Sequence, residues 1–149
     1  MAAVVCRANL SAAQSVPGGV FTKINFNVTS FNVGGGFNTS SSQFAPTTAG
    51  YYSISSVVMF TGNPGGSNTG VAIYKNGSLY SETFNCPGTP ASIGSFINDI
   101  VPLDVGDYVE IFAVQSTGGA LNADAGAPNT FFAGTLLYQI CTVPPSATC

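Results

Sequence analysis

Apolar and polar residues alternate along most of the chain with the period of two that is typical of half-buried β-strands, and helical periodicity is scarce. Within residues 49–60, one face collects large apolar side chains with a single polar interruption: Tyr52, Ile54, Ser56, Val58 and Phe60. Segments rich in glycine, asparagine and serine separate the alternating stretches, notably 31–43, 61–70 and 116–129. This spacing predicts about eight to ten short strands, which favours a sandwich or a barrel.

The clearest local signal is the pair Asn76-Gly77 inside residues 70–84. Asn-Gly is the preferred centre of a type I′ turn because both central residues need a positive φ, so the segment predicts a β-hairpin. A last apolar strand is expected over residues 130–143, where Pro144-Pro145 cannot continue a hydrogen-bonded ladder. The length and the lack of a linker predict a single domain over residues 1–149, with a short C-terminal tail, 143–149.

The composition excludes several classes of function. Charged residues make up 6% of the sequence and the net charge is −3, so no basic surface is expected to bind nucleic acid. The absence of histidine excludes Ser-His-Asp and Cys-His catalytic groups and imidazole metal ligands. No apolar run approaches the length of about 18 residues that a transmembrane helix needs, so no membrane insertion is expected. We therefore expect no enzymatic activity, no metal and no cofactor.

Several phrases of the sequence resemble the signature of the globular head of complement q-subcomponent. Residues 37–55 resemble its Phe-Asn, Phe-x-x-Pro and Gly-x-Tyr elements, and the matching residues are Phe37, Asn38, Phe44, Pro46, Gly50 and Tyr52. Residues 71–80 look like its Lys-Asn-Gly hairpin, 101–111 like its Gly-Asp turn, and 129–137 like its closing Phe-x-Gly-x-Leu-Leu strand. The matches follow the family order over almost the whole chain.

The resemblance implies an all-β fold, a ten-stranded jelly-roll β-sandwich of the complement q-subcomponent and tumour necrosis factor-like type, assembled as a homotrimer. The sequence departs from the family pattern because no Trp follows the Gly-Asp turn and no collagen-like repeat is present. The mammalian immune role is therefore not carried over. A viral, phage or bacterial member of this family is expected instead.

Three of the six acidic residues, Asp104, Asp107 and Glu110, lie three positions apart. Asp104 and Asp107 flank Val105-Gly106, where a turn needs short polar side chains and a glycine, so a structural role is favoured. The alternatives are a calcium loop, which needs denser oxygen ligands, and a glycosidase pair, which needs two carboxylates about 5–9.5 Å apart across a cleft. The residues assigned to turns or to the family signature are Gly50, Asn76, Gly77, Gly106 and Asp107.

The four cysteines are Cys6, Cys86, Cys141 and Cys149, and their spacing fits no zinc motif. Cys141 and Cys149 bracket a loop with two prolines, so a bridge between them is the first candidate disulfide. Cys6–Cys141 is the competing pair, because the first and last strands of a jelly roll are neighbours. Either bridge requires an oxidising compartment.

The sequence contains eleven Phe and six Tyr, more than the core of one such domain readily needs. We therefore expect Tyr52, Phe112 and Phe131 to pack around a threefold axis. A sugar-stacking surface is the alternative use of the tyrosines, namely Tyr51, Tyr74, Tyr80, Tyr108 and Tyr138.

Two classes of function remain. The first is a non-enzymatic structural or adhesive trimer on a virion surface, either a phage or viral capsid decoration protein or a fibre tip, whose partners are other capsid or fibre proteins. The second is a secreted, extracellular module that recognises carbohydrate or protein. The start of the sequence lacks the basic region of a secretory signal, which favours the first class. In both, the loops 61–70 and 116–129 are expected to carry the contacts, with the termini on the attachment side.

Overall fold

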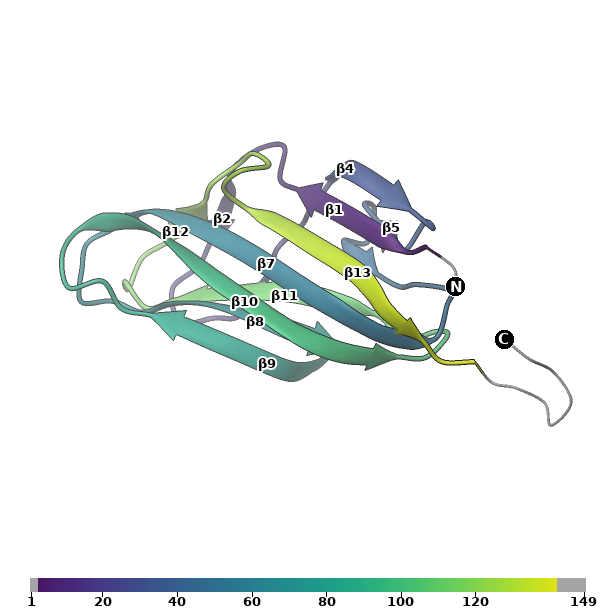
Figure 1. The fold of residues 1–149 in the computed structure, drawn as a ribbon. Helices are drawn as coiled ribbons and strands as arrows, with labels where there is room; N and C mark the ends of the chain where they lie inside the picture. Colours follow the sequence, from purple (N-terminus) through teal and green to yellow (C-terminus); the bar gives the residue numbers. More distant parts are fainter. Residues whose placement is uncertain (1–2, 142–149) are drawn as a thin grey trace, which may run out of the picture.

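The computed structural model describes residues 3–141, which form two antiparallel β-sheets packed face to face (Figure 1). The first sheet contains β1 (Val5–Asn9), β2 (Gln14–Val16), β4 (Val28–Val33), β7 (Gly50–Asn63), β10 (Ala91–Leu103), β12 (Leu121–Ala123) and β13 (Phe131–Gln139). The second sheet contains β3 (Thr22–Lys23), β5 (Phe37–Asn38), β6 (Gln43–Phe44), β8 (Thr69–Lys75), β9 (Ser78–Asn85) and β11 (Val109–Gln115). The predicted all-β sandwich is confirmed. The additional short strands were not predicted because two or three residues are too few to show an alternating pattern.

Strand β7 is the centre of the first sheet. It pairs with β10 along most of its length on one side, and with β13 and then β12 on the other. Strand β13 pairs with β1, and β1 pairs with β4, so the first and last strands are neighbours. In the second sheet β11 pairs with β8, and β8 forms a hairpin with β9. The edge strands of the first sheet are therefore β2, β4 and β10.

The alternating pattern of β7 separates its side chains onto the two faces of the first sheet. The predicted inward set is fully buried: Tyr52, Ile54, Ser56, Val58 and Phe60. The hydroxyl of Ser56 donates a hydrogen bond to the carbonyl of Phe131 at 2.7 Å, so the one polar member of this set is satisfied. The residues between them point away from the core and are partly or fully exposed.

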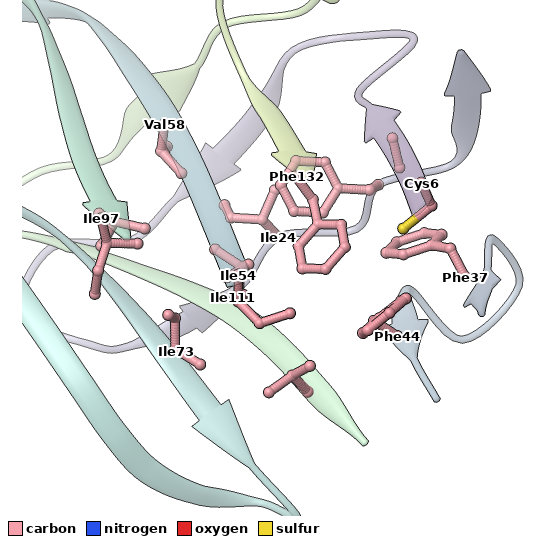
Figure 2. Packing of buried hydrophobic residues seen from close by; sticks show 14 of the residues in the cluster. Cys6, Ile24, Phe37, Phe44, Ile54, Val58, Ile73, Ile97, Ile111 and Phe132 are labelled. Carbon is pink, nitrogen blue, oxygen red and sulfur yellow. The ribbon is translucent and has the colours of Figure 1, made fainter. Parts of the chain in front are cut away.

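Between the sheets, aromatic residues of the family-like phrases form one cluster. The ring centroid of Phe132 lies 5.1 Å from that of Phe37 and 5.6 Å from that of Phe44. Phe44 in turn meets Tyr52 edge-on at 5.4 Å. Figure 2 shows Phe37, Phe44 and Phe132 gathered beside Cys6. Gly134 leaves room for this cluster, because a Cβ there would lie 3.3 Å from atoms of two of the rings.

The last strand ends earlier than predicted. Strand β13 stops at Gln139, opposite Gly50, the first residue of β7, and not at residue 143. Beyond the strand, Ile140 still donates its backbone amide to the carbonyl of Ala49 at 2.9 Å. Gly50 allows this close pairing, since a Cβ at that position would collide with the carbonyl oxygen of Tyr138. The predicted tail 143–149 lies outside the described residues.

Candidate assembly surface and loop end

The outer face of the first sheet, which points away from the core, carries uncharged polar side chains and many large apolar ones. Cross-strand pairing aligns them in rows, such as Phe131, Val57 and Phe96. Its large exposed side chains are Phe31 (44%), Val33 (50%), Tyr51 (44%), Phe96 (56%), Ile100 (52%), Leu137 (48%) and Tyr138 (65%). At about 150–200 Å² per side chain, these expose roughly 600 Å² of apolar surface, a size that marks interaction sites.

Charge is nearly absent from this face. Among the described residues that β1, β4, β7, β10 and β13 point outward, Arg7 is the one charged side chain. Its guanidinium carbon lies 4.3 Å from the ring centroid of Phe131, and it donates to the carbonyl of Ala127 at 2.6 Å. Arg7 is thus already held by contacts within its own chain. The other polar side chains on this face, including Ser53, Ser55, Asn98 and Thr135, are uncharged.

The three residues predicted to surround a threefold axis lie in three different places. The prediction for Tyr52 is wrong, because its side chain is fully buried in the core of its own chain and its hydroxyl donates to the carbonyl of Thr48 at 2.7 Å. Phe131 does lie on the outer face of the first sheet. Phe112 lies on the outer face of the second sheet, paired with Ala72 of β8. They cannot form one contact surface.

The outer face of the second sheet carries a smaller aromatic cluster. Phe21 lies 6.1 Å from Tyr74 and 6.5 Å from Phe84, and Tyr74 lies 4.1 Å from Phe112, between ring centroids. Phe84 packs over Gly70, where a Cβ would lie 2.6 Å from its ring. The rings therefore cover the small residues of β8 and pack against one another. They stabilise this sheet, and the ring of Phe84 is still exposed.

The predicted tyrosines are likewise divided among several surfaces. The rings of Tyr51 and Tyr138 lie 6.5 Å apart between centroids, tilted by 46°, on the outer face of the first sheet, whereas Tyr74 lies on the second sheet. Tyr80 donates its hydroxyl to the carbonyl of Ile100 at 3.0 Å, bridging the edges of the two sheets. Tyr108 follows the turn after β10. These five side chains form no common sugar-stacking platform.

The three neighbouring carboxylates have two separate structural roles. Asp107 accepts from the backbone amide of Asp104 at 2.9 Å and from the Asn76 side chain at 2.8 Å, and it pairs with Lys75 at 3.1 Å. These contacts, led by the Asn76 hydrogen bond, lower the pKa of Asp107 to about 2. Glu110 instead pairs with Lys23 at 2.5 Å. The predicted role in the turn is confirmed for Asp107, and Glu110 takes no part in that turn.

The predicted hairpin is also confirmed. Asn76 and Gly77 connect β8 to β9, and their φ values are +51° and +78°, as a type I′ turn requires. Gly106, in the neighbouring turn, has a φ of +99°. The two turns lie side by side, because Asn76 donates its backbone amide to the carbonyl of Tyr108 at 3.0 Å.

The cysteines offer little chemistry within residues 3–141. Cys6 is a free thiol buried between the sheets, and this burial raises its pKa to about 12. The competing Cys6–Cys141 bridge is therefore wrong: Cys6 lies opposite Gly134, whereas the disulfide-bonded Cys141 follows the end of β13. The Cys141–Cys149 bridge involves a residue outside the described part and stays a prediction. Cys86 is a free and exposed thiol.

Over the same residues, no group of three or more His, Cys, Asp and Glu side chains lies together in a way that could hold a metal ion. No helix within this range is long and apolar enough to cross a membrane.

Three loops meet at the end of the sandwich opposite the end of β13 (Figure 1). Hydrogen bonds join them: Asn68 and Ser116 exchange two bonds of 2.9 and 3.0 Å, and Gly66 donates to the carbonyl of Pro87 at 2.7 Å. We call residues 62–68, 86–90 and 116–120 the loop end. These segments contain no charged residue. The loop end is therefore a neutral, polar surface whose backbone is held in place.

No protein-family profile and no curated protein sequence matches this chain. Solved structures do match it: murine APRIL at pH 5.0 with a TM-score of 0.69 and 14% identity, covering 91% of this chain and 99% of that one. The globular domain of zebrafish complement 1qA matches with 0.68 and 14% over 93% and 99%, and Eiger TNF from S. frugiperda with 0.67 and 9% over 100% of both chains. The chain thus has the jelly-roll fold of tumour necrosis factor-like and complement q-like domains, as the sequence predicted. At these identities the likeness concerns the fold alone.

Proposed function

We propose that this protein is a non-enzymatic homotrimer that acts as a structural or adhesive component of a particle surface, as a phage or viral capsid decoration protein or fibre tip. The observation that carries the proposal is the outer face of the first sheet with its exposed apolar side chains, which we call the assembly face. A soluble chain rarely leaves so large an apolar area in contact with water.

A further copy of the same chain is the partner that this face fits best. Its exposed area of roughly 600 Å² approaches the 800 Å² or so that each partner contributes to a stable protein interface. The face is depleted in charge and rich in aromatic side chains, as the centres of interfaces are. The family resemblance and the shared fold favour closure of such contacts into a trimer.

We assign recognition to the loop end and attachment to the opposite end of the sandwich, where β13 ends. The loop end lies away from the end of β13 (Figure 1), so a trimer held by its first sheets can present three loop ends together. Three weak sites then act as one through their effective concentration. The neutral, hydrogen-bonded loops suit a partner without strong charge, such as a protein surface or a neutral glycan.

Light scattering on the purified protein tests the assembly. We expect the mass of a trimer, and we expect the double variant Phe96→Glu, Ile100→Glu to be monomeric, because both side chains lie exposed on β10. Val105→Glu is the matched control, since Val105 is 69% exposed but lies in the turn between β10 and β11 and not on a strand of this face. A monomeric wild type, or a double variant that keeps the trimer mass, contradicts the proposal.

Location on a particle needs a separate test. Antibody-gold labelling of particles from the native source, viewed by negative-stain electron microscopy, should decorate virions or their fibres. The second candidate is a secreted carbohydrate- or protein-binding module, and the aromatic cluster around Phe84 on the second sheet favours it because that cluster lies away from the assembly face. Labelling of the medium or of cell envelopes without particles would support this second candidate instead.

A further inference from the structure

The tip of the β8–β9 hairpin combines a reactive dipeptide with an unusual set of contacts. Asn76-Gly77 is the single Asn-Gly pair in the sequence, and Asn76 is exposed. In such a pair the backbone nitrogen of the glycine can attack the Asn side-chain carbonyl carbon, because no Cβ on the glycine obstructs the approach. The sequence alone therefore marks Asn76 as the position most susceptible to deamidation.

In the folded structure, both the nitrogen and the oxygen of the Asn76 side-chain amide are hydrogen-bonded. Its Nδ2 donates to Oδ1 of Asp107 at 2.8 Å, and its Oδ1 accepts from the backbone amide of Tyr108 at 2.9 Å. Asp107 is held in turn by Lys75 at 3.1 Å and by the backbone amide of Asp104 at 2.9 Å. These contacts fix the side chain in the turn, and its carbonyl carbon cannot rotate toward Gly77 while they persist.

We propose that Asn76 is a deamidation site gated by Asp107, which reacts only when the Asn76–Asp107 contact opens and which cannot restore that contact afterwards. In the first step the nitrogen of Gly77 bonds to Cγ of Asn76, the Cγ–Nδ2 bond breaks, and ammonia leaves with the proton from the Gly77 amide. Water then opens the resulting succinimide ring at one of its two C–N bonds, giving aspartate or isoaspartate.

Either product changes the contact between the two turns. The amide that donated to Asp107 becomes a carboxylate facing another carboxylate, so an attractive contact becomes a repulsive one. Isoaspartate also adds a backbone methylene that a two-residue turn cannot accommodate without losing its pairing. A molecule whose two turns have opened therefore carries a permanent chemical change at residue 76. This change lies at the end of the sandwich where β13 ends.

Peptide mapping by mass spectrometry after incubation of the folded protein at mildly alkaline pH tests the gate. We expect Asp107→Ala to deamidate at Asn76 about tenfold faster than wild type, because a charge-assisted hydrogen bond is lost. Asp107→Asn keeps a side-chain acceptor and should fall between the two. Asp104→Ala is the matched control, as its backbone amide still reaches Asp107. Equal rates in wild type and Asp107→Ala, or in folded and urea-unfolded wild type, overturn the gate.

The effect of the aspartate product on stability is tested with a variant that carries aspartate at position 76 from the start. Asn76→Asp imitates the aspartate product, and Asn122→Asp adds the same charge at an exposed position on β12. We expect a lower melting temperature for Asn76→Asp at neutral pH, and a smaller difference from wild type at acid pH, where the new carboxyl is neutral. Equal melting temperatures for the two variants at neutral pH would show that the product does not disturb the turns, and would overturn this part of the proposal.

Discussion

Replacing Phe132 by alanine removes the centre of the aromatic cluster between the sheets. The ring is 1% exposed and touches rings from three other segments, at 5.1 Å to Phe37, 5.6 Å to Phe44 and 6.3 Å to Phe26. Deleting about 200 Å² of buried aromatic surface removes about 5 kcal/mol of hydrophobic stabilisation at 25 cal/mol per Å². Measured Phe→Ala substitutions in cores cost about 3–5 kcal/mol. We expect a loss in that range, a large part of the roughly 5–15 kcal/mol that stabilises a typical domain.

Urea unfolding followed by tyrosine fluorescence measures this loss. All variants are compared at one protein concentration, because assembly links stability to concentration. Phe84→Ala is the matched control, since it removes the same ring from the outer face of the second sheet, where 48% of the side chain is exposed. We expect the control to lose less than half as much free energy of unfolding. If Phe132→Ala costs less than about 1.5 kcal/mol, or no more than the control, the cluster does not hold the sheets together.

Three further predictions concern the backbone, the acid limit and the thiols. Gly50→Ala should cost about 2–3 kcal/mol in urea unfolding, because its Cβ collides with the carbonyl oxygen of Tyr138; a neutral effect would contradict the need for close pairing. Because the pKa of Asp107 is lowered from 3.8 to about 2, its contribution is complete above pH 4 and is lost as the pH falls toward 2, so the melting temperatures of wild type and Asp107→Ala should converge in that window. A thiol reagent should label Cys86 rapidly and Cys6 only after unfolding, since Cys6 is buried with a pKa of about 12; equal labelling rates would contradict the buried position.

The features that could be predicted from the sequence are those decided by neighbouring residues. The period-two pattern of β7 identified its buried side chains, because each apolar residue on that face repeats the environment of the last. Asn76-Gly77 and the Asp107 turn followed from the φ values and side-chain contacts that such turns require. These features need no knowledge of distant strands.

The wrong predictions concern contacts that depend on the pairing of strands far apart in the sequence. The prediction that Tyr52 lies at a subunit interface is wrong because Tyr52 shares one face of β7 with Ile54 and Val58. That face is buried in the core of the chain itself. The pairing of Cys6 with Cys141 assumed that neighbouring strands bring their cysteines together. The register instead places Cys6 opposite Gly134. A shift of one residue in the register changes which residues face each other across two strands. Phe112 and Phe131 lie in similar alternating apolar sequences, so the sequence does not show that they face different surfaces. They do so because β11 belongs to the second sheet and β13 to the first.

Several of the residues that carry the family resemblance pack the two sheets together, including Phe44, Tyr52 and Phe132. A signature of this kind specifies a fold and is silent about a ligand. In the proposed function, specificity therefore resides in positions that the signature does not cover, above all the loop end. This separation explains how the chain can share its fold with proteins only 9–14% identical to it.

The last prediction follows from that separation. Asn68→Glu and Ala120→Glu each place one charge in the neutral loop end, at exposed positions on different loops. We expect both variants to keep the trimer mass and the wild-type melting temperature, because neither side chain contacts the assembly face or the core. Binding to the partner recognised by the loop end should weaken, since a buried unpaired charge at a contact is costly. Val105→Glu, at the opposite end of the sandwich, should bind that partner like wild type. If the loop variants fall apart into monomers, the loop end belongs to the subunit interface, and the two surfaces have been assigned the wrong way round.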